Sequence, residues 1–210
     1  MRKIALLTLL LLGCINLNAQ EATLKTIGHK VASLGTFSCD VDFTTKIIDG
    51  DENTISGTMV VSGDKYVVKF KNFEVYSNGV SLWTFVPERK EVTIDNVTKE
   101  DAGLFTNPKD FLSLSSKDFE VKERLAISSL EGENENVLEL NPKSELMKAS
   151  VSKVFLKYNK SSLPERVIVD LLDNSIVMVV ISNLEGHKIV TNQEFIFNLS
   201  RAKEVIDFRK

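Results

Sequence analysis

The chain has few side chains that could perform acid–base, nucleophilic or metal chemistry. His29 and His187, its two histidines, fall in an expected helix and beside an expected turn, with no Cys or His at the spacing of a zinc site. The closest acidic pairs lie in expected loops, where solvated charge is the ordinary role: Glu100 with Asp101, Glu133 with Glu135, and Asp49 with Asp51. No Gly-x-Ser-x-Gly motif and no phosphate-binding glycine loop occurs. The sequence therefore predicts neither an enzyme nor a bound metal or organic cofactor.

The start of the chain has the composition of a secretory signal peptide. Arg2 and Lys3 precede the apolar run Ile4 to Leu12, and the small residue Ala19 offers a cleavage point. The run is too short for a membrane anchor. We therefore expect residues 1–19 to be a signal peptide, residues 20–210 to form a single domain, and the mature protein to be periplasmic.

A second interpretation of the same segment stays open. Leu11-Leu12-Gly13-Cys14 resembles the lipobox of bacterial lipoproteins, in which the cysteine is lipidated after cleavage. Lipidation of Cys14 would tether the protein to the inner or outer membrane, whereas cleavage after Ala19 would release it.

Charge and cysteine content exclude one class of partner and assign a role to the remaining cysteine. Cleavage after Ala19 removes Arg2 and Lys3 and no acidic residue, so the net charge changes from −3 to −5. An acidic chain without a cluster of Lys and Arg does not attract phosphates, which excludes nucleic acid as a partner. Cys39 would be the one cysteine left, and its alternation with apolar residues predicts a packed thiol in a strand.

The mature chain begins with a helical pattern. Leu24, Ile27, Val31 and Leu34 recur at spacings of three and four residues and form one apolar stripe, and Gly35 is a natural stop. The sequence therefore predicts a helix before the first strand.

After this helix the apolar period changes to two. Phe37, Cys39, Val41 and Phe43 share one face of a strand, and the turn Asn78-Gly79 is a strong hairpin signal. Asn107-Pro108 opens one short helix within the run of strands. Further strands are expected at 119–121, 124–128, 137–140, 151–158, 166–172, 175–181, 187–191 and 194–199. This pattern predicts an α+β, mostly β fold, with a curled antiparallel sheet.

Aromatic side chains are concentrated on the expected strands. Periodicity allows two interpretations: an ordinary core beneath a sheet, or an apolar cavity for a lipid that the short helix around Phe111 closes. On the second interpretation, the lid contacts are Phe111 and Leu112, and the candidate lipid-binding wall consists of Phe37, Phe43, Met59, Val61, Tyr66, Val68, Phe70, Trp83 and Phe85.

Four segments together resemble the outer-membrane lipoprotein carrier family (LolA-like). They are Tyr76 to Pro87, which contains Leu-Trp-Thr-Phe, then Leu24 to Phe43, Asn107 to Leu112, and Gln193 to Asp207. Two positions depart from the family pattern. Ser62-Gly63-Asp64-Lys65 stands where family members carry the Arg-Pro whose arginine holds the lid, and Ser200-Arg201-Ala202 replaces a Pro-x-Gly.

The resemblance implies an unclosed β-barrel with a helical lid over an apolar concave face. It also implies a monomeric periplasmic carrier whose cargo is lipid-modified proteins. The implied partners are an inner-membrane lipoprotein-releasing transporter and an outer-membrane acceptor. A tethered acceptor or envelope lipid sensor of the same fold, anchored through Cys14, is the alternative.

Overall fold

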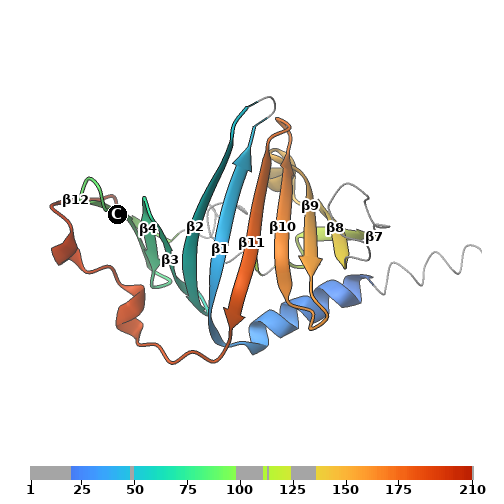
Figure 1. Ribbon diagram of the computed structural model, residues 1–210, viewed down its shortest axis with the longest axis horizontal. Helices are drawn as coiled ribbons and strands as arrows, with labels where there is room; N and C mark the ends of the chain where they lie inside the picture. Colours follow the sequence, from blue (N-terminus) through green and yellow to red (C-terminus); the bar gives the residue numbers. More distant parts are fainter. Residues whose placement is uncertain (1–19, 48–49, 98–110, 113, 124–135, 210) are drawn as a thin grey trace, which may run out of the picture.

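The computed structural model describes residues 20–47, 50–97, 111–112, 114–123 and 136–209, and its centre is one sheet (Figure 1). The twelve strands lie in the order β12-β6-β5-β4-β3-β2-β1-β11-β10-β9-β8-β7. Their bounds are β1 Thr36–Lys46, β2 Glu52–Ser62, β3 Lys65–Phe70, β4 Glu74–Ser77, β5 Ser81–Val86, β6 Glu91–Asn96, β7 Phe119–Glu123, β8 Val137–Pro142, β9 Val151–Tyr158, β10 Pro164–Leu171, β11 Ile176–Glu185 and β12 Glu204–Asp207.

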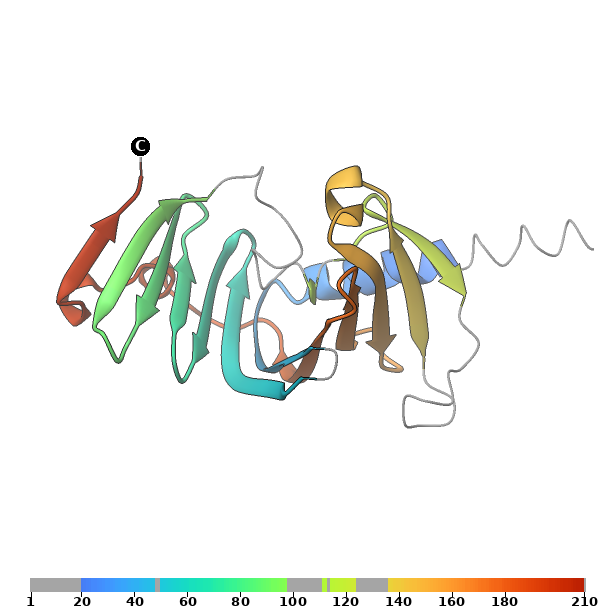
Figure 2. The same ribbon diagram turned by 90° about the horizontal axis from the view of Figure 1, so that it is seen from above.

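The sheet is mixed and open. All neighbouring strands pair antiparallel except β12, which pairs with β6 in parallel. The end strands β7 and β12 lie at opposite ends of the molecule (Figure 2), and each has a single partner strand among the described residues. The mostly β prediction is confirmed. The predicted antiparallel pairing is confirmed for every neighbouring pair except β12 with β6. The predicted curl of the sheet into an unclosed barrel is wrong, because the open sheet is not strongly curled.

Separate layers on the two faces explain why the apolar surface is buried without closure of the sheet. On one face lies the helical segment 20–33, whose Leu24, Ile27 and Val31 are buried against the strands. Gly35 has a positive φ of 63° directly after the helix, a conformation that glycine adopts without strain. The predicted amphipathic helix and its stop are both confirmed. We name the buried residues on this face the helix-side cluster, and it also contains Phe111, Leu112 and Leu114.

Over β3 to β6, the other face is covered by the segment that links β11 to β12. This segment contains the 3₁₀ helices η2 (Asn192–Phe195) and η3 (Leu199–Arg201). Strands predicted at 187–191 and 194–199 are therefore wrong. We name the buried residues on this face the strap-side cluster: Val67, Tyr76, Trp83, Phe85, Val92, Ile94, Phe195 and Phe197.

Two further differences concern helices and one predicted strand. The short helix α2 (Glu145–Lys148), capped by the Ser144 side chain, was not predicted. The predicted lid helix lies mostly outside the described residues, which include Phe111 and Leu112 as one 3₁₀ turn. The predicted strand 124–128 also lies outside them.

A guanidinium–carboxylate pair fixes the segment between β11 and β12 to the sheet. Arg201 donates to both oxygens of Glu74, with Nη2–Oε1 2.7 Å and Nη1–Oε2 2.8 Å, and the Tyr76 hydroxyl donates to Oε2 at 2.6 Å. The guanidinium carbon also lies 4.8 Å from the ring centroid of Phe85 and 5.2 Å from that of Phe197. Such bidentate, stacked geometry is specific to arginine.

This pair gives the fold a defined pH dependence. Hydrogen bonds from Arg201 hold the pKa of Glu74 below its ordinary value of 4.5. A carboxyl group with a lowered folded-state pKa stabilises the fold fully above its unfolded pKa and less as the pH falls through the folded-state value. We therefore expect Glu74→Gln to lower the free energy of unfolding by about 1 kcal/mol at pH 7. The difference from the unmodified chain should shrink below pH 4.5 in urea titrations.

Glu145→Gln is the matched control. The Glu145 side chain is 90% exposed in its pair with Lys148, so its removal should change stability little at any pH. A Glu74→Gln effect of the same size at pH 3 and pH 7 would contradict the pKa argument.

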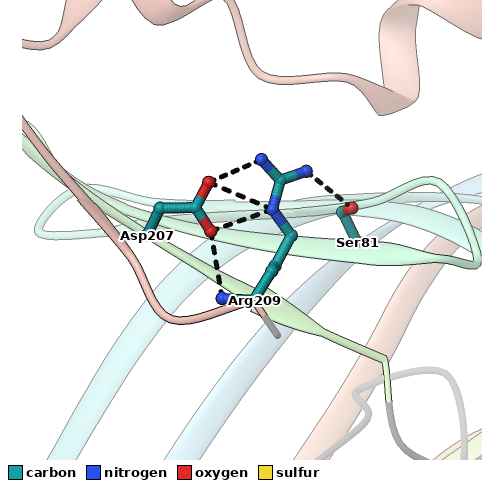
Figure 3. A network of polar contacts seen from close by, with 3 residues as sticks. All are labelled: Ser81, Asp207 and Arg209. Carbon is teal, nitrogen blue, oxygen red and sulfur yellow. Dashed lines mark hydrogen bonds and ion pairs between the residues drawn. The ribbon is translucent and has the colours of Figure 1, made fainter.

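A second ionic contact fixes the end of the described chain to β5 (Figure 3). Arg209 donates to both carboxylate oxygens of Asp207 and, through Nη1, to the Ser81 hydroxyl at 3.2 Å. The Arg209 hydrogen bonds lower the pKa of Asp207 to about 2. The carboxylate therefore stays charged, and the contact stays formed, well below the ordinary pKa of an aspartate, 3.8.

Candidate functional site

The helix-side face contains an apolar cavity of about 250 Å³. Strands β1 to β5 and β11 form its floor, and the turn at residues 111–112 covers it. The lining residues are Val41, Phe43, Ile55, Met59, Val68, Phe70, Phe73, Val75, Leu82, Thr84, Phe111, Leu112, Val179 and Ile181.

The chemistry of this lining suits hydrocarbon. Among the described residues, Thr84 is the one polar residue in the lining, and none is charged. The rings of Phe43 and Phe111 meet edge to face at a centroid distance of 6.3 Å, so strand and covering turn share an aromatic contact. Such a cavity can hold an apolar group by burial, and no titratable side chain lines it among the described residues.

One glycine is required to shape the cavity floor. Gly57 faces Phe70 across β2 and β3, and a Cβ at position 57 would lie 2.4 Å from the Lys69 carbonyl oxygen and 2.6 Å from the Phe70 ring. No other residue fits there. The Phe70 ring therefore lies across the glycine and packs on Phe73 at a centroid distance of 4.9 Å.

A second hollow of about 500 Å³ lies beside the first, between the helix 20–33 and the adjoining ends of β1 and β2. Leu112 lines both hollows. The second lining consists of Gly28, Val31, Ala32, Gly35, Thr36, Phe37, Val61, Ser62, Gly63 and Leu112.

The structure places the candidate lipid-binding residues in four groups. Residues in the first cavity are Phe43, Met59, Val68, Phe70, Phe111 and Leu112. Phe37 and Val61 line the second hollow, and Tyr66 is buried in the helix-side cluster without lining either hollow. Trp83 and Phe85 lie in the strap-side cluster, across the sheet from the cavity.

Sequence reasoning missed part of the cavity floor. Leu82 and Thr84 line the cavity, whereas Trp83 between them points to the opposite face. The alternation along β5 could have predicted this difference, because neighbouring residues of a strand face opposite sides of the sheet. The sequence interpretation chose the aromatic residues Trp83 and Phe85, although their neighbours Leu82 and Thr84 line the cavity. The other missed lining residues are Val41, Ile55, Phe73, Val75, Val179 and Ile181.

Trp83 gives a direct test of this face assignment. It is the one tryptophan of the chain and lies across the sheet from the cavity. We expect an acyl ligand brominated along its chain to leave Trp83 fluorescence unquenched when it binds, because bromine quenches only on contact. The control is the double variant Leu82→Trp, Trp83→Phe, whose tryptophan faces the cavity and should be quenched. Equal quenching of both proteins would show that the ligand lies elsewhere.

The other chemically notable side chains lack reactive surroundings. Cys39 is buried in β1 as predicted, and burial raises the pKa of its thiol to about 12. Within the part of the chain that the structure describes, no cluster of three or more His, Cys, Asp and Glu could hold a metal ion. In that same part, no helix combines the length and apolar character needed to cross a membrane.

No family model and no curated protein sequence matches the chain. Its structural neighbours are LolA superfamily and lipoprotein-sorting domains. A LolA superfamily protein from Nitrosomonas europaea shares 14% identity, with 85% of this chain and 97% of that chain covered and a TM-score of 0.45. A putative outer membrane lipoprotein-sorting protein domain from Vibrio parahaemolyticus shares 15%, with 85% and 97% covered and a TM-score of 0.46.

An uncharacterised conserved protein from Thermus thermophilus has a TM-score of 0.55 at 9% identity, with 92% of this chain and 99% of that chain covered. Two of these neighbours carry names of the LolA-like family that the sequence motifs resemble. At these identities the likeness concerns the fold alone.

Proposed function

We propose that the chain is a periplasmic carrier that binds the acyl chains of lipid-modified proteins in its helix-side cavity. It would take them from an inner-membrane lipoprotein-releasing transporter to an outer-membrane acceptor. The observation that carries this proposal is the cavity itself, which is apolar, uncharged and reached by no catalytic group among the described residues.

The energetics of acyl chains explain why such a carrier needs this lining. Exposing an acyl chain to water costs about 0.8 kcal/mol per methylene, so a chain of roughly sixteen carbons costs on the order of 12 kcal/mol. Unassisted passage through an aqueous compartment is negligible at that cost. Aliphatic and aromatic walls such as Val68 and Phe70 remove this penalty. The absence of a charged anchor from the described lining leaves the ligand free to be handed on.

The proposed location rests on the sequence. Residues 1–19 carry the signal-peptide composition and would be removed on export, which supports a periplasmic location for the carrier. The lipobox-like Leu11-Leu12-Gly13-Cys14 favours a second candidate, a tethered acceptor or lipid sensor. Metabolic labelling with radioactive palmitate separates the two, because only lipidation at Cys14 incorporates label that Cys14→Ala abolishes.

The carrier function is tested by release of lipoproteins from spheroplasts. Cells that lack an outer membrane and carry the cognate inner-membrane transporter are incubated with the purified chain. Triacylated lipoprotein in the supernatant, in a one-to-one complex with the chain, is the expected result. If the folded chain releases no lipoprotein under these conditions, the carrier proposal fails.

A further inference from the structure

One half of the sheet has a face that belongs to neither buried cluster. The segment between β11 and β12 leaves the tip of β11 and runs away from β10 and β9, toward the strands β3 to β6 that it covers (Figure 1). The helix-side cluster lies on the other face of the sheet. We name the face of β8, β9, β10, β11 and β1 that points away from the helix-side cluster the open face.

The centre of the open face is apolar. Ile168 on β10 lies directly between Phe155 on β9 and Met178 on β11, and Val180 follows on the same face of β11. Phe155 and Ile168 are buried although they belong to neither cluster, and Met178 and Val180 are half-buried. Charged side chains surround this patch. An apolar centre with a polar rim is the usual anatomy of a protein–protein interface.

Two charged side chains beside the apolar centre have no counter-charge. Arg166 and Asp42 are the neighbours of Val180 on β10 and β1, and both are half-buried. The Nε atom of Arg166 is buried and has no hydrogen-bond partner among the described residues. Within the same part of the chain, Asp42 forms no ion pair. A buried donor without an acceptor costs free energy, which an acceptor on a second molecule would recover.

A two-fold axis parallel to the strands, between β10 and β11, would bring these groups together. Rotation about it lays β10 over β11 of a second copy and β9 over β1, which is the aligned packing of two sheets. Ile168 then faces Met178 of the partner subunit. Arg166 reaches Asp42 of the partner subunit, with Lys157 beside it on β9. Because the axis is two-fold, every such contact forms twice.

The open face is also large enough for a dimer. The 8 residues of β10, at about 3.3 Å each, are roughly 26 Å long, and five strands spaced about 4.8 Å apart are roughly 24 Å wide. Two such faces bury about 1,200 Å² in total, the lower end of the range for specific interfaces. At the neighbouring level of the face, Lys153 is already paired with Glu139 at 3.3 Å.

We propose that the open face is the interface of a homodimer, in which Arg166 of each copy pairs with Asp42 of the other around the apolar centre. The first cavity lies on the opposite face of the sheet, so dimerisation leaves it unobstructed in both copies. The proposal therefore does not depend on the carrier function. It differs from the monomer that the family resemblance implies, and the oligomeric state decides between the two.

The interface is tested by sedimentation velocity and charge exchange. The unmodified purified chain should sediment as a dimer. Asp42→Arg replaces both attractive pairs by repulsive ones, so we expect it to raise the dissociation constant of the dimer by at least about a hundredfold. Adding Arg166→Asp to Asp42→Arg exchanges the two charges and should recover at least about tenfold of the lost affinity. Circular dichroism checks that each variant is folded, and Arg166→Asp alone replaces Asp42→Arg if the latter does not fold.

Glu88→Arg is the matched control. It makes the same change from an acidic to a basic side chain at an exposed position between β5 and β6, in the other half of the sheet, and should leave the dimer unchanged. A monomeric unmodified chain overturns the proposal. A dimer that Asp42→Arg leaves intact, or a folded double variant that associates no more tightly than Asp42→Arg, also overturns it, because the contact would then lie on another surface.

Discussion

Phe70→Glu is expected to abolish lipid binding while leaving the chain folded. Phe70 is half-buried and lines the first cavity, so a carboxylate at this position would project into the space that an acyl chain must fill. Bringing hydrocarbon against it desolvates the charge without a partner, which costs several kcal/mol. We expect affinity for a dipalmitoylated peptide to fall by at least about a hundredfold, or roughly 2.7 kcal/mol. Isothermal titration calorimetry measures the change.

Thr58→Glu is the matched control for this variant. Thr58 is exposed on β2, where it lies opposite Lys69 on β3. The substitution adds the same charge on the strand next to that of Phe70, on the face of the sheet opposite the cavity. Affinity and lipoprotein release should be unaffected. Full binding by a Phe70→Glu protein with normal circular dichroism and thermal unfolding would place the ligand outside this cavity.

The local elements of the fold were predictable because each depends on residues close together in sequence. The apolar stripe of the first helix and its stop at Gly35 need no tertiary information. The turn at Asn78-Gly79 was also readable: Gly79 has a φ of 86°, and the Asn78 side chain accepts from the amide of Ser81 at 2.8 Å.

The flatness of the sheet, and the face to which each strand residue points, were not predictable in the same way. Alternation sorts Leu82 from Trp83, but it does not say which face carries the cavity. Both faces of β3 to β5 are covered, so aromatic residues occur on each of them. A sequence rule that assigns aromatics to one wall fails where two layers compete for them.

The prediction of strands in the segment after β11 was wrong for a related reason. Phe195 and Phe197 alternate like strand residues, yet they are buried by packing on the sheet rather than by pairing within it. The capping of η2 by Thr191 and Glu194 and of η3 by Asn198 was a local signal that would have found the 3₁₀ turns. The alternation of apolar residues alone could not distinguish a strand within the sheet from a segment that packs on the sheet.

The strap-side cluster depends most on Phe197. Its side chain is 2% exposed, and its ring contacts Tyr76 and Phe85 at centroid distances of 5.5 and 4.7 Å, with the Arg201 guanidinium above it. Phe197→Ala removes these contacts and leaves a cavity. We expect the free energy of unfolding to fall by about 3–5 kcal/mol in urea titrations.

Lipid binding should respond differently from stability in this variant. Phe197 lies across the sheet from both hollows, so a folded population at low temperature should bind the dipalmitoylated peptide with affinity close to that of the unmodified chain. Leu199→Ala, in the same segment but 47% exposed, should change stability by no more than about 0.5 kcal/mol. A large loss of affinity in folded Phe197→Ala would mean that the strap-side cluster shapes the cavity wall through β3 to β5. The two faces of the sheet would then act as one unit, and the C-terminal segment would belong to the binding machinery.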